Sequence, residues 1–123
     1  MVDSNEKQAA TVARELGCEV FSDPASLLAE VDAVSVAVPT TLHHAIGLEV
    51  LSAGCHLLVE KPIASSSAEA RELVALAGKK GLVLQVGHIE RFNPAVSALR
   101  GIDVHPRFVE AHRLAPYLSL IHI

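Results

Sequence analysis

One lysine stands out among the residues whose type and position could do chemistry. Lys61 comes directly after Glu60 and directly before Pro62, at the end of the apolar run His56–Val59. A lysine in water, with a pKa of about 10.4, is a poor base at neutral pH. A positioned ammonium group, however, can hold an oxygen and stabilise negative charge that develops on it, and desolvation can bring a lysine's pKa towards useful values. The alternative is an ordinary surface lysine at a strand end, which composition alone favours.

Two further positions stand where open sheets of parallel strands bind their ligands. Pro39-Thr40 follows the apolar run 33–38, at the carboxyl end of a predicted strand. The alternative for this pair is a simple turn. Asp3 stands directly before a predicted helix, where dinucleotide-binding folds place the acidic residue that accepts hydrogen bonds from the adenosine ribose. The alternative for Asp3 is a solvated turn or an N-cap aspartate.

The histidines and cysteines do not predict a metal site. His43 and His44 are neighbours on a predicted helix, so their side chains point about 100° apart. No other cysteine or histidine joins them at ligand spacing, and Cys55 and His56 alternate across a predicted strand. Cys18 and Cys55 cannot build a disulfide framework, and we expect both to be reduced, buried, small apolar residues.

The elements that must position these residues alternate along the chain. Apolar runs predict strands at 18–21, 33–38, 56–60, 82–86 and 107–114. Helical spacing of apolar residues, with caps at the ends, predicts helices at 5–16, 24–28, 42–53, 66–77 and 93–99. We expect Gly17, Gly54 and Gly78 to end three of these helices.

This alternation predicts an α/β protein with a Rossmann-type, doubly wound parallel sheet. Strands 33–38, 56–60 and 82–86 should form a parallel ladder in that order. The Gly-rich loop of such a fold should lie roughly 20 residues before Asp3, and none of the seven glycines forms a G-x-G. We therefore expect the sheet to lack its first strand and that loop.

Composition excludes several classes of partner. Half of the 123 residues are apolar and 20% are charged, which supports an ordered core. The net charge of −4 argues against nucleic acid and anionic membrane as partners. The N-terminus has no signal-peptide pattern and no apolar stretch is long enough for a bilayer, so we expect a cytoplasmic protein.

Three stretches in order resemble one known family. They are Val38-Pro39-Thr40-Thr41-Leu42-His43, then Ala53–Pro62 (AGCHLLVEKP), then Val86–Pro94 (VGHIERFNP). Together they resemble the Gfo/Idh/MocA (glucose–fructose oxidoreductase/inositol dehydrogenase) family, whose corresponding motifs are T-P-N-x-x-H and A-G-K-H-V-x-x-E-K-P. The similarity extends to about Tyr117. Val38 stands where the family usually has Thr, and Thr40 stands where it usually has Asn.

The resemblance implies an NAD- or NADP-dependent oxidoreductase that acts on a sugar, polyol or nucleotide-sugar hydroxyl, in a parent protein that forms homo-oligomers. The final stretches are similar to those of members that oxidise the 3-hydroxyl of a UDP-N-acetylhexosamine. The resemblance assigns catalysis to Lys61 and the cofactor site to Asp3, Ser4, Val38, Pro39, Thr40, His43, Glu60, Lys61 and Arg91. An acidic Asp3 repels a 2′-phosphate and so favours NAD over NADP, a preference that Ser4 and Asn5 could soften.

We expect residues 1–100 to be part of an NAD(P)-binding domain and residues 101–117 to begin a substrate domain. Read back into codons, residues 118–123 match a transposon-end adaptor used in sequencing, so we expect a non-native tail; the alternative is the start of a natural strand. We also expect these 123 residues to be inactive alone. Two other functions stay open: a non-catalytic nucleotide-binding or interaction module, and another doubly wound enzyme such as a methyltransferase.

Overall fold

The computed structural model describes residues 1–102, 105, 107, 108, 110 and 112. The chain divides into two compact units, Met1–Ile89 and Glu90–Ile123. The first unit ends before residue 100, where the sequence predicts the end of the NAD(P)-binding domain. The division of the chain into residues 1–100, 101–117 and 118–123 stays a prediction. Four of the eight residues of the strand predicted at 107–114 lie outside the described residues, and the other four (107, 108, 110 and 112) do not form a strand.

The first unit is built on a three-stranded parallel sheet. Its strands are β1 (Ala33–Val36), β2 (His56–Val59) and β3 (Leu84–Val86), in the order β1-β2-β3. In register, Val36 lies beside Val59, which in turn lies beside Val86. The α/β class, the parallel pairing and the predicted order of the ladder are confirmed.

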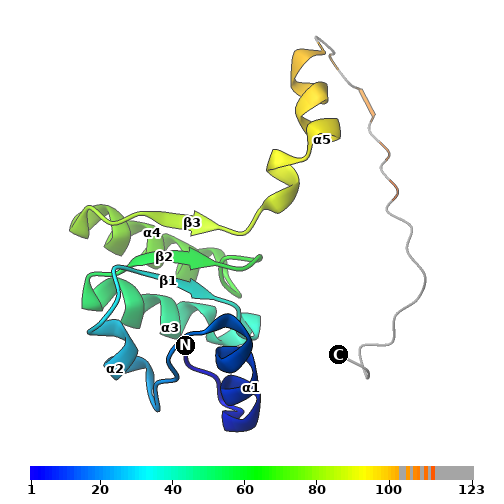
Figure 1. Ribbon diagram of the computed structural model, residues 1–123. Coiled ribbons are helices and arrows are strands. Elements are labelled where there is room, and N and C mark those ends of the chain that lie inside the picture. Colours follow the sequence, from blue (N-terminus) through cyan, green and yellow to red (C-terminus); the bar gives the residue numbers. More distant parts are fainter. Residues whose placement is uncertain (103–104, 106, 109, 111, 113–123) are drawn as a thin grey trace. The chain divides into compact units, whose positions relative to one another are not determined.

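Two helices cover one face of this sheet (Figure 1). Helix α3 (Thr40–Ala53) contacts β1 and β2, and α4 (Ser67–Lys80) contacts β3 and packs against α3. The core between helices and sheet is aliphatic, and its largest fully buried apolar side chains are Leu51, Leu57, Leu73 and Val59. Burying such side chains contributes about 1.5–3 kcal/mol each, which makes this helix-covered face the main source of stability.

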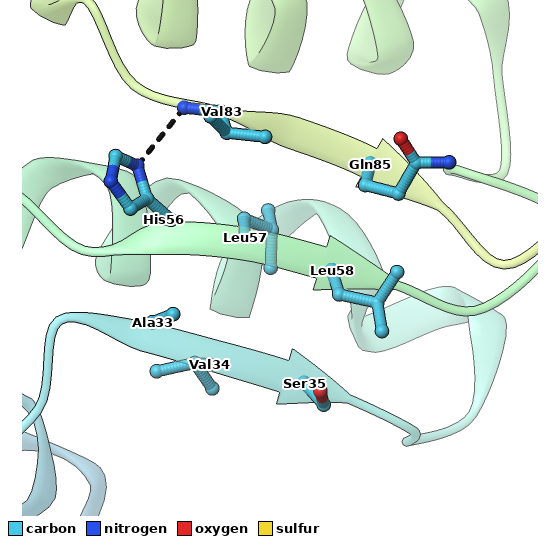
Figure 2. Close-up of a pocket in the computed structure, with 8 residues that line it drawn as sticks. All are labelled: Ala33, Val34, Ser35, His56, Leu57, Leu58, Val83 and Gln85. Carbon is cyan, nitrogen blue, oxygen red and sulfur yellow. Dashed lines mark hydrogen bonds between the residues drawn. The ribbon is translucent and has the colours of Figure 1, made fainter.

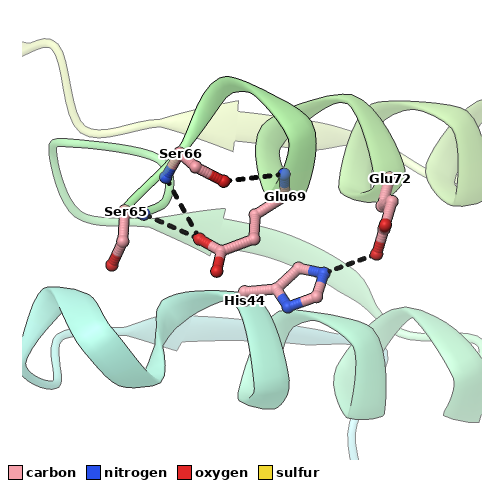
Figure 3. Close-up of polar contacts among 5 residues, drawn as sticks. All are labelled: His44, Ser65, Ser66, Glu69 and Glu72. Carbon is pink, nitrogen blue, oxygen red and sulfur yellow. Dashed lines mark hydrogen bonds and ion pairs between the residues drawn. The ribbon is translucent and has the colours of Figure 1, made fainter.

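Polar side chains cap three helices where the sequence predicts their starts, whereas α3 begins at Thr40, two residues earlier than predicted and without a side-chain cap. Asn5 caps α1 (Glu6–Leu16) by accepting a hydrogen bond from the Gln8 N–H, and Asp23 caps α2 (Pro24–Leu28) in the same way from Ser26. Ser66 and Glu69 form a reciprocal capping box at the start of α4, as Figure 3 shows. These caps satisfy N–H groups that have no partner inside the helix.

The prediction that Gly78 ends a helix was wrong. Helix α4 runs through Gly78 and ends at Gly81, which adopts the left-handed conformation with φ +66°. Lys79 and Lys80 fill the last turn, where positive side chains suit the negative end of the helix dipole.

The N-terminal side of the unit also departs from expectation. Residues 18–21 do not form a strand and instead form two hydrogen bonds with Met1. The Phe21 N–H donates to the Met1 carbonyl, and the Met1 amino group donates to the Glu19 carbonyl. A strand requires a partner along its length, and Met1 pairs with only this short stretch. Cys18 is exposed, contrary to prediction, whereas Cys55 is buried, and its thiol donates to Val31 O at 3.2 Å.

After β3, the described part of the chain contains one short helix between two 3₁₀ turns. A 3₁₀ turn, η1 (Ile89–Phe92), is followed by α5 (Pro94–Ala98) and by a second 3₁₀ turn, η2 (Leu99–Gly101). Asn93 caps α5 by accepting from the Ala95 N–H. None of the helices among the described residues has the length and apolar character needed to cross a membrane.

Candidate functional site

The carboxyl ends of the three strands bring most of the predicted site residues to one edge of the sheet. Glu60 follows β2 and donates its N–H to Val36 O at 3.0 Å. Gly87 follows β3 and donates its N–H to Val59 O at 2.8 Å. The hydrogen-bonded ladder therefore continues one residue past β2 and β3, so the backbones of Glu60 and Gly87 are set by the sheet itself.

The side chain of Glu60 crosses to the neighbouring strand end. A β-carbon built on Gly87 would lie 3.0 Å from both carboxylate oxygens of Glu60. The same carboxylate accepts a hydrogen bond from the backbone N–H of Lys61, with Oε2 at 3.2 Å. Glycine at position 87 thus makes room for the group that holds the Lys61 backbone. Gly87 is not among the predicted site residues; its signals were its position directly after a predicted strand and within the stretch Val86–Pro94.

Lys61 itself is exposed at this edge, and the peptide bond between Lys61 and Pro62 is cis. The side chain is thus accessible to a ligand that lies over the strand ends. Its predicted catalytic role stays a prediction.

His43 lies in the first turn of α3, and its side chain is 1% exposed. Its Nδ1 is 2.8 Å from the carbonyl oxygen of Pro62, and its Nε2 is 2.9 Å from that of Val38. The ring therefore connects the segment after β2 to the segment after β1. Both ring nitrogens are used in these contacts, and direct contact of His43 with a cofactor stays a prediction.

His44, the next residue, has a different partner. Its Nε2 lies 2.8 Å from Oε2 of Glu72, across the contact between α3 and α4 (Figure 3). The two histidines thus do not converge, as the helical geometry predicts. The described residues contain no group of three or more histidine, cysteine, aspartate or glutamate side chains that could hold a metal ion.

The remaining predicted residues lie in separate places. Asp3 is half-buried, and its Oδ1 accepts from the Asn5 N–H at 2.8 Å, while Ser4 is exposed. This contact is a local turn, which is the alternative to a ribose-binding role for Asp3. Pro39 and Thr40 begin α3 at the carboxyl end of β1, where the predicted site lies. Arg91 lies in the 3₁₀ turn η1 and belongs to the second compact unit, whereas the sheet belongs to the first.

A groove also crosses the face of the sheet that α3 and α4 do not cover (Figure 2). It is lined by Ala33, Val34, Ser35, His56, Leu57, Leu58, Val83 and Gln85, and none of the predicted site residues is among them. His56 has a structural contact there, because its Nδ1 accepts the Val83 N–H at 3.0 Å. This contact links the starts of β2 and β3, at the opposite end of the strands from Lys61.

Comparisons with known proteins agree with this architecture. Residues 1–88 match the model of the Gfo/Idh/MocA oxidoreductase family, described as an NAD-binding Rossmann fold. The chain is 46% identical over 116 residues to UDP-N-acetylglucosamine 3-dehydrogenase of Acidithiobacillus ferrooxidans, a match that covers 94% of this chain and 37% of that relative. The chain thus spans little more than a third of that relative's length.

Solved structures extend the likeness to three dimensions. The Acidithiobacillus enzyme superposes with a TM-score of 0.78 at 45% identity, covering 80% of this chain and 33% of the other. A 3-ketoreductase from Actinomadura kijaniata, solved with NADP and TDP-benzene, superposes with a TM-score of 0.76 at 29% identity, covering 80% of this chain and 31% of the other. Because the family model matches residues 1–88 and a relative is 46% identical over 116 residues, this chain belongs to the Gfo/Idh/MocA family of oxidoreductases with an NAD-binding Rossmann fold.

Proposed function

We propose that this chain forms part of the NAD(P) site of an oxidoreductase that moves hydride between nicotinamide and a hydroxyl of a sugar or nucleotide sugar. The observation that carries the proposal is the placement of Lys61. It is exposed at the carboxyl edge of a parallel sheet, directly after the ladder bond of Glu60, in a family of NAD-binding oxidoreductases. Ligands of open α/β sheets bind outside this edge.

The residues present fit such a cofactor. Gly87 carries no side chain where the strand ends meet, which makes room for the Glu60 carboxylate, while the Lys61 side chain stays exposed at the edge where a ligand would lie. Pro39 and Thr40 flank the same edge at the end of β1, next to Val38. Asp3, with Ser4, would accept hydrogen bonds from the adenosine ribose, and its negative charge favours NAD over NADP. We assign Arg91 to the cofactor on family resemblance alone.

The proposed chemistry assigns one task to each group at the edge. When bound, the nicotinamide supplies the hydride acceptor. The Lys61 ammonium holds the substrate hydroxyl oxygen and stabilises the negative charge that develops on this oxygen as the hydroxyl proton passes to solvent water. The Glu60 carboxylate accepts the Lys61 N–H, which fixes the backbone from which the ammonium extends.

The likeness to the Acidithiobacillus enzyme favours a UDP-N-acetylhexosamine as substrate, oxidised at its 3-hydroxyl. The family resemblance supports a homo-oligomeric parent protein, and we propose that it works in the cytoplasm on small molecules. The net charge of −4 supports a small-molecule partner over nucleic acid.

The test is a hybrid enzyme in which this chain replaces the 116-residue stretch that it matches in the Acidithiobacillus relative. We expect the folded hybrid to bind NADH and to reduce NAD when UDP-N-acetylglucosamine is added, with the unaltered relative as control. A folded hybrid that binds NADH without turnover would support the non-catalytic alternative. A folded hybrid that neither binds NADH nor turns over would contradict the proposal.

A further inference from the structure

His43 occupies an unusual place in the core. Among the residues that the structure describes, it is the one polar side chain that is buried. With 1% of its surface exposed, the ring has lost its contacts with water. A polar group in that situation is retained at low cost only when its hydrogen bonds are made inside the protein.

The partners of the ring are two backbone carbonyls that come from separate connections. Val38 lies between β1 and α3, and Pro62 lies between β2 and α4. The distances, 2.9 Å from Nε2 to Val38 O and 2.8 Å from Nδ1 to Pro62 O, are those of ordinary hydrogen bonds. One side chain therefore spans the two loops that flank the candidate site.

The chemistry of imidazole defines what this bridge requires. A carbonyl oxygen only accepts, so each contact needs an N–H on the ring. A neutral ring has one N–H and donates to one of the two carbonyls at a time, whereas the protonated ring donates to both. An aliphatic side chain at position 43 has no N–H and so cannot make either contact. Replacing the histidine by such a side chain leaves a carbonyl without its donor.

We propose that His43 is a positioning residue: by holding the carbonyls of Val38 and Pro62, it sets the position of Lys61 relative to the end of β1. This rests on the proposed function of Lys61. The ring acts on the peptide segment directly after Lys61, while Glu60 holds the Lys61 N–H from the other side. A misplacement of about 1 Å at a reacting group can cost about 100-fold in rate, so the bridge has a kinetic consequence.

The chain offers a matched control on the same helix. His44 is the next residue of α3, and its ring contacts the Glu72 side chain of α4 instead of the strand-end loops. His44→Ala therefore removes a histidine and a hydrogen bond without touching the connection to Pro62. His43→Leu keeps apolar volume in the core and removes only the donors, and His43→Gln keeps a donor for one carbonyl.

The first arm uses the 123-residue chain and measures backbone order by nuclear magnetic relaxation. We expect Lys61 to lose order in His43→Leu and to keep it in His44→Ala. The second arm uses the hybrid enzyme. There we expect kcat to fall about 10- to 100-fold in His43→Ala and His43→Leu, less in His43→Gln, and little in His44→Ala, with the KM for NAD nearly unchanged.

Added small molecules separate positioning from packing. In His43→Ala, imidazole should restore part of the lost kcat because it fits the vacated space and carries an N–H. 1-Methylimidazole fills similar space but has no N–H when neutral, so we expect no rescue. Equal rescue by both molecules would overturn the proposal, as would unchanged Lys61 order together with normal kcat in His43→Leu. If the unaltered hybrid proves inactive, the proposed function fails, and the relaxation arm still decides whether His43 holds Lys61.

Discussion

The carboxylate of Glu60 lies against the backbone of Gly87, so close that a β-carbon at position 87 would be 3.0 Å from both of its oxygens. Glu60 directly follows β2 and Gly87 directly follows β3, and the backbone N–H of each donates a hydrogen bond to the neighbouring strand. The two residues therefore meet because their strands are parallel and in register. The contact places the carboxylate where it accepts the Lys61 N–H.

This relationship predicts energetic coupling between the two positions. Gly87→Ala should displace the Glu60 carboxylate and weaken its bond to Lys61, whereas the same change in a Glu60→Ala background has no carboxylate to displace. We expect a coupling energy of at least about 0.5 kcal/mol in a double-mutant cycle of urea unfolding on the 123-residue chain. Additive effects of the two changes would contradict the close contact.

Alanine substitutions at two helical glycines should change the free energy of unfolding in opposite directions. A β-carbon at Gly47 in α3 would lie 2.9 Å from Leu73 Cδ2 and 3.2 Å from Leu57 Cδ2, and both leucines are fully buried. We expect Gly47→Ala to lower the free energy of unfolding by about 1–3 kcal/mol through overpacking.

Gly78 in α4 is the matched control, because a β-carbon there meets nothing within 4 Å. Gly78→Ala should raise the free energy of unfolding by about 0.5–1 kcal/mol through helix propensity and a less flexible unfolded chain. Chemical denaturation of both variants measures the difference. Similar effects at the two sites would show that α3 does not approach β2 and α4 as closely as described.

The cap of α2 should depend on pH. Hydrogen bonds from the Ser26 hydroxyl, then from the Ser26 N–H and the Ser22 hydroxyl, hold the pKa of Asp23 below its ordinary value of 3.8. A depressed folded-state pKa means that the stabilisation is present above about pH 4 and is lost as the pH falls through the folded-state pKa.

Asp23→Asn keeps a capping oxygen and cannot titrate in this range. We expect the stability advantage of wild type over Asp23→Asn to shrink on acidification, and the side-chain carboxyl signal of Asp23 to titrate below pH 3.8. Parallel acid unfolding curves for the two proteins, with an Asp23 midpoint at the ordinary value, would contradict this cap geometry.

The fold was largely predictable because its signals are local. The apolar runs that became β1, β2 and β3 carry their own pattern, and caps such as Asn5 and Ser66 act within three residues of themselves. Two of the wrong element predictions had non-local causes. Both Gly78 and Gly81 can end a helix, and residues 18–21 needed a partner strand to become one.

The placement of Glu60 and Lys61 after a strand was predictable from the sequence, and the contacts around them were not. Lys61 and Glu60 follow from a strand-end motif and its family resemblance. The bridge from His43 to Pro62, and the approach of Glu60 to Gly87, join loops that meet only when the sheet assembles. Backbone carbonyls and glycines carry these contacts, and neither leaves a pattern that sequence spacing identifies.

The central claim is that Lys61 takes part in the proposed reaction, and one measurement tests it most directly. In the hybrid enzyme, Lys61→Met keeps an unbranched side chain and removes the ammonium, while Lys79→Ala, in the last turn of α4, is the charge control. We expect Lys61→Met to lower kcat by about 100-fold or more, with NAD affinity only modestly changed and Lys79→Ala close to normal. Near-normal turnover in Lys61→Met would remove Lys61 from the mechanism and leave the function resting on family resemblance alone.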